Sequence, residues 1–464
     1  MPERRSAEGS RSSWRPTLHE HDGPLYVRIV DALRSDIRRG VLLPGDRLPT
    51  HRAIARHLDV TLSTVTHAIN EATRQHLVDG RVGNGTFVLG ANVDAALFAA
   101  TLTDAVAPAT DQRRDLIDLT SNTPAIQTDS RDLQEVFRAL ARRGSAELGG
   151  YPTQHQLRRG ETMFADLLRA RGVVVPPDGI VLAAGAQQAL LATLITVAGP
   201  GAKVLAESLT FPGLKAVARA LRLQLVPVRI DQEGLVPTEL ERVCRSSGST
   251  TLVCVPTLHN PTGATMSATR RAAIAEVVAR LGISVIEDDV YGALQNEPAL
   301  ASCAPAQTIV VTSLSKTVAA GLRLGAIVGS HPAVASIQRD VTLTSWTVSP
   351  AMIEAAVRWH DNGTIERRTI WQRNEIARRA RIARSQHNAP HLWLPTLINP
   401  DRATAMLADH GVGAVSSAAF ATSPRAPKGI RISLTAAPSH AQLHEAMTRV
   451  RGTAGIVHTK LRTP

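Results

Sequence analysis

Residues 308–325 read TIVVTSLSKTVAAGLRLG, and this stretch decides the fold and places the most informative side chain. An apolar, β-branched run at 308–311 is followed by Ser313, Ser315 and Lys316, and Arg323 comes seven residues after the lysine. Short apolar runs bounded by small or polar residues are typical of buried strands. The chain has five lysines among 52 basic residues, so a lysine in this position is informative. The stretch predicts a strand that delivers a lysine to the edge of a sheet.

Similar runs recur along the chain between longer amphipathic segments, at 179–182, 203–206, 251–255, 283–286 and 325–328. This alternation predicts an α/β domain built on a mostly parallel sheet. Asn260 follows one of these runs, and Asp288 and Tyr291 follow another. Ligands of open α/β sheets bind beyond the carboxyl ends of the strands. We therefore expect an amide, an acid, a phenol and the lysine to share one site.

Pyridoxal phosphate (PLP) requires this set: an amine, an anion for its ring nitrogen, donors for its phenolic oxygen and a cationic phosphate pocket. The order GAQ, NPTG, D..Y, SLSK and G.R.G resembles the fold-type I aminotransferases of class I/II, from residue 116 to residue 453. That resemblance implies a large PLP-dependent domain with a smaller C-terminal α/β domain.

The resemblance implies a role for each matching residue. Lys316 would be the catalytic residue that bonds to the cofactor, and Asp288 would keep the pyridine nitrogen protonated. Asn260 and Tyr291 would bind the phenolic oxygen, and Arg431 would pair with the α-carboxylate of a substrate or effector in bidentate fashion. Phe211 would stack on the cofactor ring, and Tyr151 would bind the phosphate in the site of the other subunit. The phosphate in the chain's own site would be bound by Ala186, Gln187, Ser313, Ser315 and Arg323.

Alternatives stay open at three of these positions. Asp289 could replace Asp288 as the ligand, Arg431 could be a solvent-facing strand arginine, and Phe211 could be part of the core. The family also has a glycine and a longer turn where this chain has residues 153–158, TQHQLR. This departure puts ordinary aminotransferase specificity in question.

The N-terminal part has a different pattern. Apolar residues recur every four positions from Leu25 to Ile37, and helical patterns follow at 52–58 and 62–76. Residues 77–88 carry two short strands around a glycine-rich turn. Three helices and a hairpin within about 65 residues are the layout of a winged helix-turn-helix. A helical hairpin domain used for protein contact is the alternative.

The motif PGDRLPTHRAIARHLDV, followed by STVTHAI and GNGTFV, resembles the GntR family of DNA-binding domains. The resemblance implies double-stranded DNA as the partner of a defined set of residues. These are Thr50, Arg52, Ser63, Thr64 and Thr66, with Gly83 and Gly85 shaping the wing. Leu62 and Asn84 stand where the family often has arginine. Residues 1–90 carry 13 Arg and 10 acidic residues, a net charge of +3, so we expect binding that is sensitive to salt.

The pattern predicts four segments: a flexible arm at 1–23, the winged helix at 24–90, a linker at 91–114 and the aminotransferase-like domain at 115–453. Net charge is +12 and hydrophobic content 44%, which excludes wholesale disorder. The longest apolar run, 189–198, is too short to span a bilayer, and no signal peptide is visible. Three cysteines without metal-ligand spacing fit a reduced, cytoplasmic chain without a metal site.

Together the two halves resemble the MocR subgroup of GntR regulators. That resemblance implies a homodimeric regulator of transcription whose large domain senses an amino acid, an amine or a form of vitamin B6. A working aminotransferase that carries a DNA-binding appendage is the alternative, because the full set of chemical residues is present.

Overall fold

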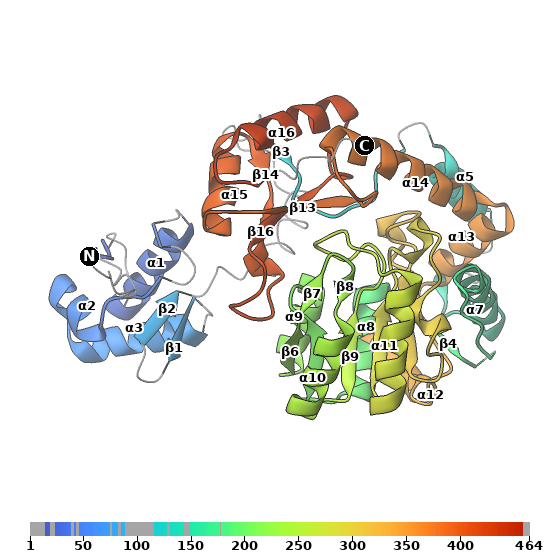
Figure 1. The fold of residues 1–464 in the computed structure, drawn as a ribbon, viewed down its shortest axis with the longest axis horizontal. Helices are drawn as coiled ribbons and strands as arrows, with labels where there is room; N and C mark the ends of the chain where they lie inside the picture. The colour runs from blue at the N-terminus through green and yellow to red at the C-terminus, as the bar shows by residue number, and fades with distance from the viewer. Residues whose placement is uncertain are drawn as a thin grey trace. The chain divides into compact units, whose positions relative to one another are not determined.

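The computed structural model describes residues 14–18, 24–38, 41–42, 46–74, 77–81, 85–88, 116–127, 130–142, 148–176 and 178–457. The chain forms two compact units, residues 1–108 and 109–464 (Figure 1). The division falls within the predicted linker 91–114, which itself lies outside the described residues. Among the described residues, no helix is long and apolar enough to span a membrane.

The first unit contains three helices and a two-stranded antiparallel sheet. Its elements are α1 (Leu25–Arg38), α2 (His51–Leu58), α3 (Leu62–Arg74), β1 (Val78–Arg81) and β2 (Gly85–Val88). Within the helical pattern predicted at 62–76, four apolar residues of α3 are buried: Val65, Ala68, Ile69 and Ala72. The predicted winged helix-turn-helix is therefore confirmed.

Residues 14–18, at the end of the predicted arm, lie against the winged helix. Trp14 is 7% exposed and packs in the core of the winged helix with Ile29 and Leu33. Its indole Nε1 donates a hydrogen bond of 2.8 Å to the buried carboxylate of Asp36 on α1. A single aromatic residue in a polar stretch has no periodicity, so the sequence pattern could not reveal this contact.

The second unit is built on a seven-stranded sheet in the order β4-β12-β11-β10-β9-β5-β6. Six strands run in one direction, and β12 alone is antiparallel to its neighbours. The strands are β4 (Ile180–Ala183), β5 (Lys203–Glu207), β6 (Gln224–Val228), β9 (Thr251–Cys254), β10 (Ser284–Asp288), β11 (Thr308–Ser313) and β12 (Gly325–Val328). The six apolar runs expected to be strands all belong to this sheet.

Helices cover both faces of the sheet. One face packs against α8 (Ala186–Val197), α9 (Pro212–Ala220) and α12 (Val334–Ser345). The opposite face packs against the four helices α7 (Gln154–Arg169), α10 (Pro237–Ser247), α11 (Ala268–Leu281) and α13 (Pro350–Asp361). Helix α5 (Asp132–Leu140) contributes to the same core as α7 and α13. The hairpin β7 (Ile230–Asp231) and β8 (Gly234–Leu235) follows β6.

A smaller C-terminal part has its own core (Figure 1, orange to red). It contains α14 (Thr364–Ala383), α15 (Pro400–Asp409), α16 (His440–Gly452) and the antiparallel strands β13 (His391–Pro395), β15 (Val415–Ser416) and β16 (Gly429–Ser433). Strand β14 (Val412–Gly413) pairs with β3 (Ile117–Asp118), so the first strand of this unit joins the C-terminal part. Val457 N still donates to Pro395 O at 2.8 Å, four residues beyond the predicted end at 453.

Candidate cofactor site and DNA-contacting face

The carboxyl ends of β10 and β11 bring Asp288 and Lys316 together. Asp288 is the last residue of β10, and Lys316 follows the last residue of β11 by three positions. The Lys316 Nζ lies 5.9 Å from the centre of the Tyr291 ring and donates to the backbone oxygen of Asn122. An amine, a carboxyl and a phenol from the ends of two neighbouring strands thus share one buried site.

Burial shifts the pKa values of Lys316 and Asp288 so that each group favours its neutral form. It lowers the pKa of Lys316 to about 8, and the nearby Arg431 contributes in the same direction. It raises the pKa of the Asp288 carboxyl to about 7, although Lys316 opposes that shift. Desolvation is the common cause, since a low-dielectric site penalises each charged form. Groups with such shifts are typical of functional sites.

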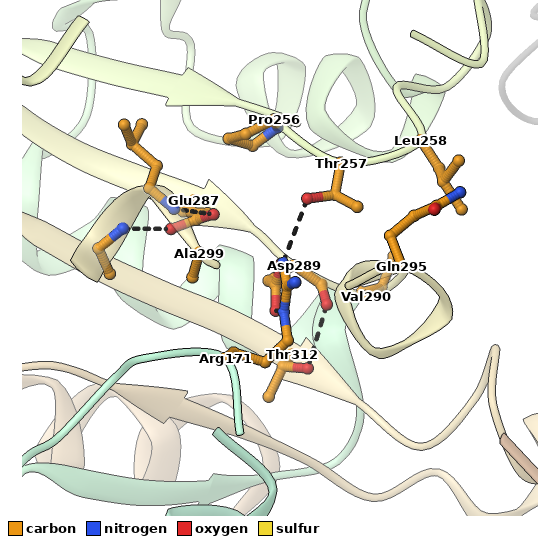
Figure 2. Close-up of polar contacts among 12 residues, drawn as sticks. Arg171, Pro256, Thr257, Leu258, Glu287, Asp289, Val290, Gln295, Ala299 and Thr312 are labelled. Carbon is orange, nitrogen blue, oxygen red and sulfur yellow. Dashed lines mark hydrogen bonds and ion pairs between the residues drawn. The ribbon is translucent and has the colours of Figure 1, made fainter. Parts of the chain in front are cut away.

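The neighbouring Asp289 has a different role. Arg171 forms an ion pair with it, with Nη2 to Oδ1 at 2.9 Å, and also donates to Thr257 at 3.2 Å (Figure 2). Asp288 accepts instead from the backbone nitrogen of Val290 at 3.3 Å. Because Asp289 is engaged by a buried guanidinium, Asp288 is the better candidate for a ligand at the strand end.

Arg431 on β16 faces into the site. It is 3% exposed, so the alternative that it is a solvent-facing strand arginine is wrong. Its Nη1 donates to Asn260 Oδ1 at 3.4 Å, and its Nη2 donates to the backbone oxygen of Thr120. Its Nε is buried and has no hydrogen-bond partner among the described residues. This guanidinium therefore retains donor capacity for an anionic ligand.

An anion cradle lies at the start of α8. Gly185 precedes the helix with a φ of +89°, and Ala186 is its first residue, so the free N–H groups of the first turn face outward from the helix end. Arg323 lies against Gly185, where an added Cβ would come within 2.7 Å of its Nη2. Ser315 Oγ is buried without a partner in the described chain. This combination fits a phosphate group.

Three further predicted residues lie in the first turn of α8, directly before α9 and at the surface. Gln187 donates its amide to Gly213 O at 3.0 Å, which fixes the start of α9. Phe211 directly precedes α9 and is half-buried rather than enclosed in the core. Tyr151 is 73% exposed, with its ring centre 6.3 Å from that of Trp346. Ser313, at the end of β11, accepts from the backbone nitrogen of Ser315 at 3.4 Å.

Sequence reasoning missed Asn122 and His391. Asn122 Nδ2 lies 2.7 Å from Tyr291 Oη and 3.0 Å from His391 Nδ1. The partners are separated from Asn122 by 169 and 269 residues. The only signal was position, because Asn122 follows the first apolar run of the large domain.

The predicted DNA-contacting residues lie on α2, α3 and the hairpin. Thr50 caps α2 by accepting from Ala53 N at 3.3 Å, and Arg52 is exposed in the first turn. Ser63 and Thr66 line a shallow hollow on the outer face of α3, and Thr64 Oγ1 is 2.8 Å from that of Thr61.

The wing carries the remaining two predicted residues. Gly85 begins β2 with a φ of +103°, which a side chain would strain. Gly83 lies outside the described residues.

The fold and the site define a class I and II aminotransferase domain joined to a GntR-type DNA-binding domain. The chain matches the family "Aminotransferase class I and II" over residues 114–450. It matches "Bacterial regulatory proteins, gntR family" over residues 25–88. An archaeal alanine:glyoxylate aminotransferase has the same fold, with a TM-score of 0.69 and 18% identity over 82% of this chain and 96% of that chain.

Two relatives that the chain resembles are named as regulators of transcription. The HTH-type transcriptional regulator YdeF of Bacillus subtilis is 32% identical over 360 residues, 76% of this chain and 75% of YdeF. The vitamin B6 salvage pathway transcriptional repressor PtsJ of Salmonella typhimurium is 26% identical over 448 residues, which are 92% of this chain and 100% of PtsJ. The chain belongs to this family of transcriptional regulators, which has the MocR-type architecture.

Proposed function

We propose that this regulator binds PLP at Lys316 and changes its binding to DNA when an amino acid or amine effector enters the same site. The observation that carries the proposal is the buried pair of Lys316 and Asp288 beside an anion cradle. When bound, PLP supplies an aldehyde that reacts with amines and a ring that accepts electrons. Asp288 would bind the ring nitrogen, and Arg323, Ser315 and the first turn of α8 would bind the phosphate.

The donor set of this chain supports that fit. Burial raises the pKa of the Asp288 carboxyl to about 7. A protonated pyridine nitrogen beside this carboxyl would restore its ionised state. A phosphate would give partners to Ser315 Oγ, which has none among the described residues. Arg431 would bind the carboxylate of an effector, and its Nε, which has no partner among the described residues, would donate one of the hydrogen bonds.

Visible absorption of the purified full-length chain tests this proposal. We expect a visible absorption band from bound PLP after incubation with the cofactor and removal of the unbound excess. Titration with single amino acids and amines should change the band for the effector class alone. A chain that stays colourless after the incubation would contradict the proposal.

The pKa of Lys316 gives a pH dependence with a definite sign. Only the neutral amine attacks an aldehyde, and burial lowers the pKa of this amine to about 8. We expect the rate of PLP binding by the cofactor-free protein to rise with pH and to level off above about 8. The rate for a free lysine side chain, with a pKa of about 10.4, would continue to rise above pH 8. A rate that still climbs toward pH 10 would contradict the assignment.

The DNA-contacting face gives a second expected result. Arg52→Ala removes an exposed cation from the first turn of α2, so we expect weaker binding to any duplex. The slope of log affinity against log salt should become shallower by about one, the effect of one lost phosphate contact. Arg34→Ala is the matched control, since Arg34 pairs with Asp31 on α1. Fluorescence anisotropy with a labelled non-specific duplex measures both slopes. Equal slopes would show that Arg52 does not contact a DNA phosphate.

A homodimer is part of the proposal. Tyr151 is exposed on the surface of its own chain, where a second copy could approach it, which supports a role in a partner's site. Light scattering of the PLP-loaded protein should give twice the mass of one chain. A monomer that binds PLP normally would contradict the assignment of Tyr151 to a partner's site.

A working aminotransferase is the second candidate, favoured by the presence of all the chemical residues at one edge of the sheet. Turnover with an amino acid and a keto acid at about 1–10³ per second would favour the enzyme. A spectral change without turnover would favour the sensor.

A further inference from the structure

Asn122 lies at the centre of a hydrogen-bond network that joins the cofactor residues to the C-terminal part of the unit. Its Nδ2 is 2.7 Å from Tyr291 Oη and 3.0 Å from His391 Nδ1. Its Oδ1 accepts from Ser433 Oγ at 3.3 Å. Its backbone oxygen accepts from Lys316 Nζ. All polar atoms of the side chain therefore have partners, and each partner sits on a different element.

The geometry determines which atoms carry hydrogens. His391 Nε2 lies 2.9 Å from the backbone oxygen of His259, which can only accept, so this nitrogen carries the ring hydrogen. Burial lowers the pKa of His391 to about 3, so the ring is neutral and Nδ1 is an acceptor. Asn122 gives one amide hydrogen to Nδ1 and the other to Tyr291 Oη. The contact from Ser433 to Oδ1 agrees with this orientation of the amide.

The direction of the Tyr291 hydrogen follows from this network. Tyr291 is 4% exposed, and burial raises the pKa of its phenol, so the hydroxyl keeps its hydrogen. Because its oxygen accepts from Asn122, its hydrogen points away from the amide. Without Asn122, His391 Nδ1 would lose its donor and become a competing acceptor, since the centres of the two rings are 5.9 Å apart. The charged groups that act on the phenol are Arg431 and Asp288, with Lys316 over its ring.

We propose that Asn122 is a positioning residue that holds the Tyr291 hydroxyl as a hydrogen-bond donor to the phenolic oxygen of PLP. The inference rests on the proposed function and adds a residue to it. A donor at that oxygen weakens its hold on the neighbouring imine proton and so lowers the pH at which the bound cofactor changes colour. Asn122 acts on this pH midpoint through Tyr291 alone.

The test measures the pH midpoint of the visible absorption in the PLP-loaded full-length chain. Asn122→Ala should raise the midpoint by about one pH unit, the size expected for one lost hydrogen bond. Asn122→Leu keeps the number and branching of the side-chain heavy atoms without a donor and should give the same shift, which guards against a misfolded alanine variant. Ser433→Ala removes only the contact to Oδ1, so its midpoint should match the original chain.

A double-mutant cycle separates positioning from a structural role. Tyr291→Phe should raise the midpoint by itself, and adding Asn122→Ala should then change nothing further, because the route through the hydroxyl is already gone. A merely structural asparagine would lower the unfolding temperature and leave the midpoint in place. An unchanged midpoint in both Asn122 variants, or shifts that add in the double variant, would overturn the inference. A colourless original chain would overturn the proposed function, and the inference with it.

Discussion

Lys316→Ala is expected to separate DNA binding from effector sensing. The variant loses the one amine that the described part of the chain places at the Asp288 end of β10, so PLP can no longer bond to the protein there. In the original chain we expect an effector to change DNA affinity by about 5–150-fold, the usual range of allosteric coupling. In Lys316→Ala this ratio should fall to one, because a ligand shifts an equilibrium only by its differential affinity for the two states.

The control is Lys203→Ala, which removes an exposed lysine whose Nζ contacts Ser247 O at 3.1 Å. It should keep the visible band and the full effector ratio. Fluorescence anisotropy with and without effector gives the ratio for each variant. An unchanged ratio in a folded Lys316→Ala protein would show that the effector acts elsewhere.

Arg171→Ala is expected to destabilise the large unit by about 3–5 kcal/mol. The substitution leaves the Asp289 carboxylate, whose side chain is 2% exposed, without its buried counter-charge. Thr257 also loses a donor, at 3.2 Å (Figure 2). Breaking one side of a buried pair is costly because the remaining charge cannot be solvated.

The matched control is two residues away. Arg169 pairs with Asp166 at 2.6 Å, but its side chain is 63% exposed, so Arg169→Ala should cost less than about 1 kcal/mol. Urea unfolding followed by tryptophan fluorescence compares the two, since Trp359 lies in the core that α7 helps to form. Equal, small losses in both variants would mean that Asp289 needs no counter-charge.

The sequence predicted six of the seven strands of the main sheet, because each of the six is a continuous apolar run between turns. It predicted that Lys316, Asp288 and Tyr291 share one site, because the carboxyl ends of parallel strands lie at one edge of a sheet. Beyond the sheet, the helical pattern at residues 62–76 predicted α3.

Long-range contacts without a local pattern could not be predicted. Asn122 meets His391 across 269 residues, and Arg171 meets Asp289 across 118. Neither contact follows from strand ends or helix faces. Trp14 is a similar case, because one aromatic residue in a polar stretch gives no sign of the core that it joins. Only the folded chain shows which of two adjacent aspartates already has a partner.

The central claim is that Lys316 is the residue that bonds to PLP. Reduction of the PLP-loaded chain with borohydride, then peptide mapping by mass spectrometry, tests it directly, since the sequence offers five lysines. We expect one modified peptide, the one that contains residue 316. A label on any of the other four lysines, or no label at all, would contradict it.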